Sequence, residues 1–148
     1  MSIKLQLDGF DELLKEIQKA EGNVQSATVH TMRKSADIMQ NTLKAEMLKS
    51  NVDTRLINSM PASKIQNDYG LITARVGWEK GAYDPKNPSD AYKVIFMNYG
   101  TPNRTQHGKI QQGGKVKLGF IKRAKNKAKK SIKAQQEETL KEILKGLK

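Results

Sequence analysis

Two long segments with helical periodicity, residues 24–49 and about 118–147, constrain the fold of this 148-residue chain more than any other feature. An α-helix turns by about 100° per residue, so residues three or four positions apart share a face. Small side chains dominate the predicted inward face of the first segment, which should therefore pack closely against a sheet or a second helix. That predicted face consists of Val24, Ala27, Thr28, Thr31, Ser35, Ile38, Met39 and Thr42.

The second long segment has a different character, because most of its surface is cationic. Its predicted inward stripe consists of Ile121, Ala124, Ala128, Ile132, Gln135, Thr139 and Ile143. Lysines and one arginine cover the remaining positions of its first half. The segment is therefore predicted to be an amphipathic helix with a strongly basic exposed side.

Shorter patterns predict strands and turns in the first half of the chain. Residues 3–7 alternate between apolar and polar side chains, which indicates a strand, and a short helix is expected at residues 10–22. Strand-like arms at residue 65 and residues 71–78 flank a turn at residues 67–70, which predicts a hairpin. Between the long helix and this hairpin, Asp53 is predicted to cap a short helical turn.

Two further segments complete the predicted fold. Residues 92–97, which contain the apolar run 94–97, do not alternate cleanly, and we predict a central strand. Residues 100–117 contain four glycines, one proline and no apolar pattern, and we predict a flexible loop that becomes ordered on assembly. The element order indicates a single α+β domain over residues 1–148, with a small, mostly antiparallel sheet packed against a long helix. A short N-terminal helix and a long C-terminal helix complete it.

The positive charge of the chain is confined to one block. The net charge is +12, yet residues 1–90 carry 12 Lys+Arg and 12 Asp+Glu, whereas residues 91–136 carry 12 basic and no acidic residues. Such a block indicates a polyanion or an acidic protein as partner, and the alternative is an exposed surface that only favours solubility. The predicted basic surface consists of Lys122, Arg123, Lys125, Lys127, Lys129, Lys130 and Lys133.

No pattern in the sequence indicates catalysis, a cofactor or a metal. The chain has no cysteine, and its two histidines, His30 and His107, do not form a metal-binding motif. The glycine-rich stretch at residues 108–116 fails as a phosphate-binding loop. Five residues separate Gly108 from the Gly114-Lys115 pair, whereas the motif needs four, and Val116 stands where the motif has serine or threonine. We therefore expect a protein that is not an enzyme.

The sequence also lacks the patterns of secreted and membrane proteins. The N-terminus has no apolar signal-like stretch, and the longest apolar run, residues 94–97, is far shorter than the roughly 20 residues of a membrane span. We expect a soluble protein that is intracellular when it is synthesised.

Five short motifs follow one another along nearly the whole chain. They are Phe10-Asp11-Glu12-Leu13-Leu14, the junction Asn51-Val52-Asp53-Thr54-Arg55-Leu56-Ile57-Asn58-Ser59, Val76-Gly77-Trp78, Tyr99-Gly100-Thr101 and Gly119-Phe120-Ile121-Lys122-Arg123-Ala124. In this order they resemble small morphogenetic proteins of long-tailed bacteriophages, the neck or tail-completion proteins that join head to tail. This family includes the gene-product-ten-like group of lambdoid phages. The chain departs from the family pattern at Gly119, where the family has proline, and at a junction that lacks the family's proline and glycine.

The resemblance implies a structural subunit of the virion neck, assembled in the host cytoplasm. Such subunits usually form a ring, commonly of six copies, around the DNA path. The ring lies between a head connector or head-closure protein and a tail-tube or tail-terminator protein. Residues expected to make assembly contacts in the loop are Tyr99, Gly100, Thr101, Arg104, His107, Lys109 and Lys115.

Two other functions remain open from the residues themselves. The first is nonspecific, electrostatic nucleic-acid binding, because lysines are abundant while Phe120 is the only aromatic residue after Tyr99. The second, a small toxin-like or nuclease domain, is weaker because no catalytic constellation supports it.

Overall fold

The computed structural model describes residues 2–5, 24–69, 71–79, 81, 84, 86–101, 104–106, 109–111 and 117–146. Its elements are β1 (Ser2–Leu5), α2 (Val24–Lys49), α3 (Thr54–Asn58), β2 (Lys64–Asp68), β3 (Leu71–Gly77), α4 (Asp90–Tyr99), β4 (Arg104–Gln106), β5 (Lys109–Gln111) and α5 (Phe120–Gly146). The α+β class is confirmed, and both long helices have nearly their predicted bounds. The short helix predicted at residues 10–22 lies outside the described residues.

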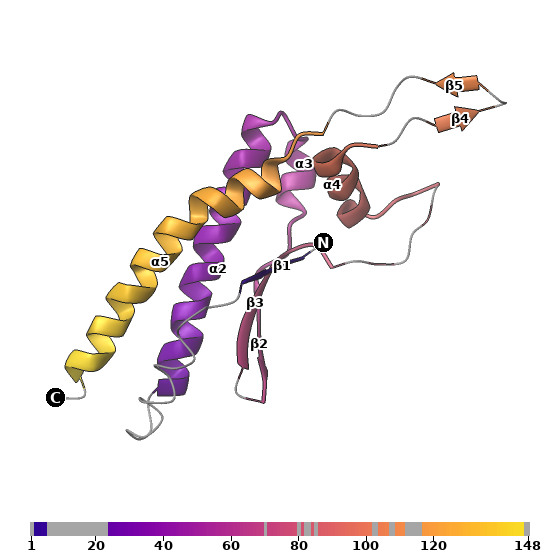
Figure 1. Ribbon diagram of the computed structural model, residues 1–148. Coiled ribbons are helices and arrows are strands. Elements are labelled where there is room, and N and C mark those ends of the chain that lie inside the picture. The colour runs from indigo at the N-terminus through magenta and orange to yellow at the C-terminus, as the bar shows by residue number, and fades with distance from the viewer. Residues whose placement is uncertain are drawn as a thin grey trace.

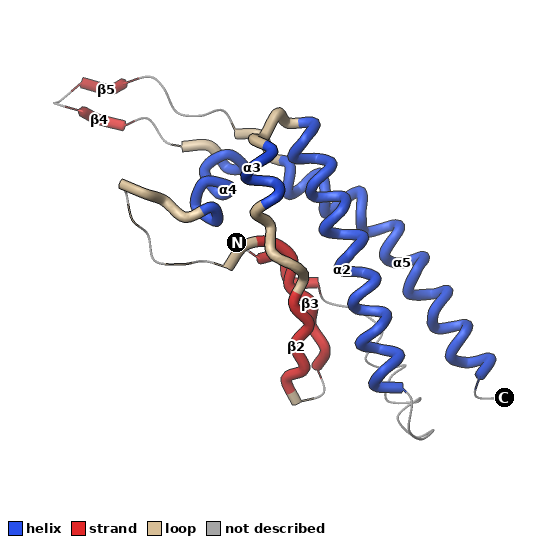
Figure 2. The backbone as a smooth tube through the Cα atoms, turned by 180° about the vertical axis from the view of Figure 1, so that it is seen from behind, coloured by secondary structure: helices blue, strands red, loops and turns tan. Residues whose placement is uncertain are grey.

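The long helix α2 lies between α5 and a three-stranded antiparallel sheet (Figure 1). The sheet has the order β1-β3-β2, so that β3 pairs with both neighbours; Val76 is opposite Ile3, and Ala74 is opposite Ile65. Seen from behind, α2 and α5 run side by side over most of their lengths, in opposite directions (Figure 2). The two helices therefore form the longest interface in the described part of the chain.

Because α2 is covered on two sides, its buried surface is wider than the single face predicted from the sequence. The predicted inward residues Thr28, Thr31, Ser35 and Met39 are buried. The additional buried residues are Met32, Ala36, Leu43, Glu46 and Met47. A single stripe of one helix cannot face both a sheet and another helix, so the one-face prediction identified only part of the buried surface.

Ser35 joins α2 to α5 through side-chain hydrogen bonds. Its hydroxyl donates to Oε1 of Gln135 at 3.0 Å and accepts a hydrogen bond from Nε2 of Gln136 at 3.1 Å. Gln135 also donates to the hydroxyl of Thr139 at 3.0 Å. Buried polar groups need such partners, and the small side chain of Ser35 leaves room for the two glutamines. The predicted small-residue face thus holds a partly buried polar cluster.

The junction after α2 and the hairpin that follows have the predicted structures. Oδ1 of Asp53 accepts a hydrogen bond from the backbone N–H of Arg55 at 2.8 Å and caps α3, whose Leu56 and Ile57 are buried. Strands β2 and β3 form the predicted hairpin, and Tyr69 in its turn has a φ of 52°. Two-residue hairpin turns commonly need positive φ, which explains this backbone conformation.

The strand predicted at residues 92–97 is wrong, because these residues lie in helix α4. Ala91, Val94 and Asn98 are its buried residues, at helical rather than alternating spacing. The backbone carbonyl of Ser89 accepts hydrogen bonds from the N–H groups of Tyr92 and Lys93, which starts the helix. A short apolar run fits a buried strand or a buried helix equally well, so periodicity alone could not separate them.

The segment predicted as a loop at residues 100–117 contains regular structure. Strands β4 and β5 pair in antiparallel register, with Arg104 opposite Gln111 and Thr105 opposite Ile110. Figure 1 shows this hairpin extending away from the helices and the sheet. We refer to the hairpin β4–β5 as the arm. Its strands are too short for the alternation that identifies a strand in a sequence.

The buried environment of Ser35 gives a test of the helix packing. Ser35→Leu should destabilise the protein by roughly 1–3 kcal/mol, because the larger side chain overpacks the α2–α5 interface and removes the bonds to the glutamines. The matched change His30→Leu, at an exposed position of the same helix, should stay within about 0.5 kcal/mol. Denaturant unfolding measures both. Equal effects would contradict the orientation of α2.

Candidate interaction surface

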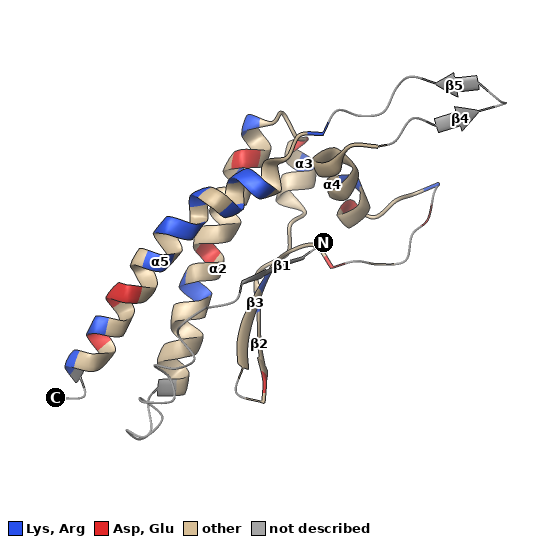
Figure 3. Ribbon diagram, viewed as in Figure 1, with Lys and Arg blue, Asp and Glu red and all other residues tan. Residues whose placement is uncertain are grey.

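The predicted basic surface lies on the first half of α5. All seven cations are exposed, and acidic residues begin only at Glu137, as Figure 3 shows by colour. The opposite side of the helix is buried in the core through Phe120, Ile121, Ala124 and Ala128. The predicted inward stripe of α5 is therefore confirmed over this half. The helix presents charge to solvent while it anchors itself on α2 and the core.

Two of the seven cations bind a buried carboxylate on α2. The side chain of Glu46 is only 3% exposed, and its Oε2 accepts a hydrogen bond from Nε of Arg123 at 3.0 Å. Its Oε1 accepts one from Nζ of Lys127, and Nζ of Lys49 lies 3.8 Å away. A carboxylate in such a place must be paired, so Arg123 and Lys127 hold the helices together.

Arg123 also binds two other segments. Its Nη2 donates to the hydroxyl of Ser50 at 2.7 Å, just beyond α2, and its Nη1 donates to the backbone carbonyl of Leu118. One guanidinium therefore joins the end of α2, the chain before α5, and α5 itself. Its planar set of donors suits several acceptors at once.

The sequence contained a signal for Glu46 that the prediction did not use. At 100° per residue, Glu46 falls at nearly the same angle on α2 as Ser35, Met39 and Thr42, one turn beyond the predicted inward face. An acidic residue on an inward face near a helix C-terminus, where the helix dipole disfavours it, requires a cationic partner. The partner itself could not be identified, because Arg123 and Glu46 are 77 residues apart.

The pKa of Glu46 reflects these contacts. Hydrogen bonds from Lys127, and then from Arg123, lower the pKa of this carboxyl below its ordinary value, and they outweigh the opposing effect of burial. Glu46 is therefore ionised at neutral pH, and its ion pairs are fully formed there.

Four of the remaining cations form a line on the other flank of α5. Lys122, Lys125, Lys129 and Lys133 are spaced by three, four and four residues. At 100° per residue they fall within an arc of roughly 80°. All four are exposed. We call these four residues the lysine row.

The base of the arm is closed by hydrogen bonds between α4 and the start of α5. The backbone N–H groups of Leu118 and Gly119 donate to the carbonyls of Met97 at 3.1 Å and Asn98 at 3.0 Å. The buried side chain of Asn98 accepts a further bond from the backbone N–H of Ile121 at 2.9 Å. Gly119 has no side chain with which to cap α5, so Asn98 supplies the acceptor from a distant segment.

The predicted assembly residues do not gather into one described site. Tyr99 is half exposed, Gly100 ends α4 with a φ of 78°, and Thr101 is partly buried. Arg104 lies in β4 and Lys109 in β5. His107 and Lys115 lie outside the described residues.

The junction residues have mainly structural roles. Val52 and Leu56 are buried in the core, while Thr54, Arg55 and Asn58 are exposed. The hydroxyl of Ser59 accepts a hydrogen bond from Nε1 of Trp78 at 3.1 Å and donates one to the carbonyl of Leu56 at 2.8 Å. Together with the Asp53 cap, these bonds fix the short helix α3 against the hairpin.

The described residues contain neither a cluster of metal-binding side chains nor a helix long and apolar enough to cross a membrane.

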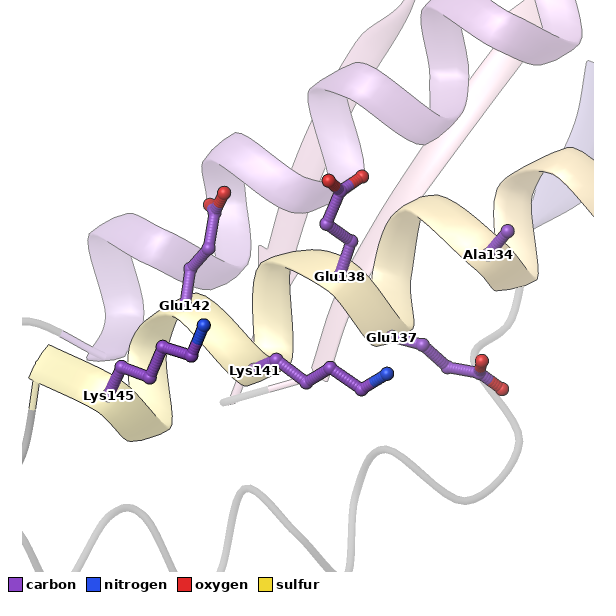
Figure 4. A pocket seen from close by; sticks show the side chains of 6 residues that line it. All are labelled: Ala134, Glu137, Glu138, Lys141, Glu142 and Lys145. Carbon is purple, nitrogen blue, oxygen red and sulfur yellow. The ribbon is translucent and has the colours of Figure 1, made fainter.

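A shallow hollow on α5 is lined by Ala134, Glu137, Glu138, Lys141, Glu142 and Lys145, whose side chains project from one helix (Figure 4). All six are exposed and their charges are mixed, which is ordinary for a solvated helix surface. His30 is exposed on α2.

Comparison of the chain with protein families, with curated proteins and with solved structures finds no match.

Removing the Asn98 amide should weaken the start of α5. Asn98→Ala leaves the N–H of Ile121 without its acceptor in a buried place, and we expect a loss of about 0.5–2 kcal/mol in the free energy of unfolding. Asn126→Ala, at an exposed position of α5, is the control and should change stability by less than about 0.5 kcal/mol. Chemical denaturation measures both variants. If Asn98→Ala did not change the free energy of unfolding, the claim that Asn98 caps α5 would be contradicted.

The low pKa of Glu46 predicts how stability depends on pH. A group whose pKa is lower in the folded than in the unfolded state contributes stability above the unfolded-state pKa and loses it as the pH falls. The melting temperature of Glu46→Gln should therefore lie well below that of the parent at neutral pH, and the gap should narrow below about pH 4.5. Glu79→Gln, which removes an exposed ion pair with Lys64, should lower the melting temperature at neutral pH by less than Glu46→Gln does. A gap for Glu46→Gln that stays constant with pH would show that the carboxylate is not ion-paired.

Proposed function

We propose that this protein is a structural morphogenesis protein of a long-tailed phage or prophage, which forms a ring at the head–tail junction around the DNA path. The subunit binds copies of itself, commonly six. Its other partners are a head connector or head-closure protein and a tail-tube or tail-terminator protein. It acts in the virion neck after assembly in the host cytoplasm, and it has no catalytic activity.

The order of the five family-like motifs carries this proposal, and the packing of three of them supports it. Val52 and Leu56 from the junction, Val76 and Trp78 from the hairpin, and Phe120 from the start of α5 all belong to one buried core. Because these motif residues contact one another in one core, a change in one motif affects the others, as expected when the motifs belong to one fold. Gly119 is a real departure, because its φ of 62° is outside the range that the family's proline could adopt.

The arm is a second observation in favour of self-assembly. It leaves the domain between α4 and α5, extends away from the other elements (Figure 1), and has a firmly bonded base at Asn98 and Gly119. A projecting hairpin of this kind suits contact with a neighbouring subunit, because it reaches beyond its own core.

The alternative function, nonspecific electrostatic nucleic-acid binding, is favoured by the lysine row. The two functions predict different behaviour. A neck protein is incorporated into virions and joins heads to tails, whereas a protein that only binds nucleic acid acts without becoming part of a particle.

Deletion of the gene from the phage or prophage that carries it tests the proposed function. We expect filled heads and complete tails that fail to join, because the ring between them is missing. Purified protein added to such an extract should restore joining, and mass spectrometry of parent virions should detect the chain. Virions without the protein, together with normal joining after deletion, would contradict the proposal.

A further inference from the structure

Six of the seven cations on the first half of α5 fall into two groups with different tasks. Arg123 and Lys127 lie on the flank that faces Glu46, where their charges are used within the fold. The lysine row lies on the other flank. Among the described residues, the row has one acidic neighbour within 4.0 Å, Glu137, whose Oε1 is 3.9 Å from Nζ of Lys133. The charges of Lys122, Lys125 and Lys129 are therefore not balanced by any described side chain.

The geometry of the row suits a linear polyanion. An α-helix rises about 1.5 Å per residue, so the four lysines span roughly 16 Å in steps of about 4.5–6 Å. One nucleic-acid strand carries a phosphate about every 3.4 Å along the duplex axis, so the row covers about five nucleotides. The row ends at Lys133, because acidic residues begin at Glu137.

We propose that the lysine row binds the phosphodiester backbone of nucleic acid. This inference rests on the proposed function for its setting, since a neck ring surrounds DNA, and it names the partner of the basic surface. An acidic protein is the less suitable partner, because lysine is depleted at the centres of protein interfaces, which are built around aromatic and apolar anchors. The exposed row contains lysine only.

Binding through the row should be independent of sequence. Phe120, the only aromatic residue after Tyr99, is fully buried and cannot stack on a base. Lysine ammonium groups act as point charges, without the planar fork by which arginine reads guanine. The contacts are therefore made to phosphates, which position the protein on the strand without reading bases.

The test compares two variants with the same change in net charge. The first replaces the row: Lys122→Gln, Lys125→Gln, Lys129→Gln and Lys133→Gln. The second replaces four exposed cations elsewhere on α2 and α5: Arg33→Gln, Lys34→Gln, Lys141→Gln and Lys145→Gln. Neither variant changes Arg123 or Lys127, so the Glu46 contacts remain. Circular dichroism confirms that each variant is folded.

Fluorescence anisotropy with a labelled duplex of random sequence, at about 50 to about 200 mM salt, measures affinity. Four phosphate contacts give a slope of roughly −3.6 in log affinity against log salt, and a loss of roughly 100-fold over this range. We expect the row variant to lose most of this slope and at least about tenfold in affinity at the lower salt. The control variant should keep a slope close to that of the parent.

Three outcomes of the comparison between the variants would overturn the inference. In the first, the row variant binds the duplex with the affinity and salt slope of the parent. In the second, the control variant loses as much affinity and slope as the row variant. In the third, the row variant no longer binds a polyglutamate peptide but still binds the duplex. If the parent does not bind DNA but is incorporated into virions, the inference fails while the proposed function stands. If row-dependent DNA binding is found but deletion leaves head–tail joining intact, the inference on the row holds and the proposed function fails.

Discussion

The buried carboxylate of Glu46 is the contact on which the arrangement of this protein depends. It binds Arg123 and Lys127 across the α2–α5 interface, and Arg123 extends the contact to Ser50 and to the carbonyl of Leu118. The end of α2, the return of the chain from the arm and the start of α5 therefore meet at one group of charges. A buried charge that loses its partner is strongly destabilising, so this contact ties the position of α5 to that of α2.

The same contact explains how α5 serves two purposes at once. Its buried stripe and its Glu46-facing flank are used for folding, while three of the four lysines of the row on the other flank have no acidic neighbour among the described residues. A helix can separate these tasks because three or four residues cover one turn. Cations that form one block in the sequence thus become two functionally different sets in space.

The residues around Asn98 also serve two purposes at once. The Asn-Tyr-Gly stretch ends α4 and supplies the cap of α5, and the arm begins and returns between these two helices. The base of the arm is therefore closed by hydrogen bonds between packed residues of α4 and the start of α5.

Much of the fold could be predicted from the sequence. Helices α2 and α5, the β2–β3 hairpin and the Asp53 cap depend on short periods or on neighbours within a few residues, and all of them appear as predicted. The strand predicted at residues 92–97 is wrong because the apolar run within it, residues 94–97, is too short to have a distinctive period. The strands of the arm were missed because they are too short to alternate. The basic surface was predicted as a block, and its subdivision was not.

The sequence by itself determined the two long helices, the position of the positive charge and the absence of cysteine chemistry, because these are properties of composition and local periodicity. Only the tertiary structure decided that Glu46 is buried, that Arg123 and Lys127 are bound to it, and that Asn98 caps a helix 23 residues further along the chain. Those contacts join segments far apart in sequence, and no local pattern specifies which distant partner a buried charge or amide will find.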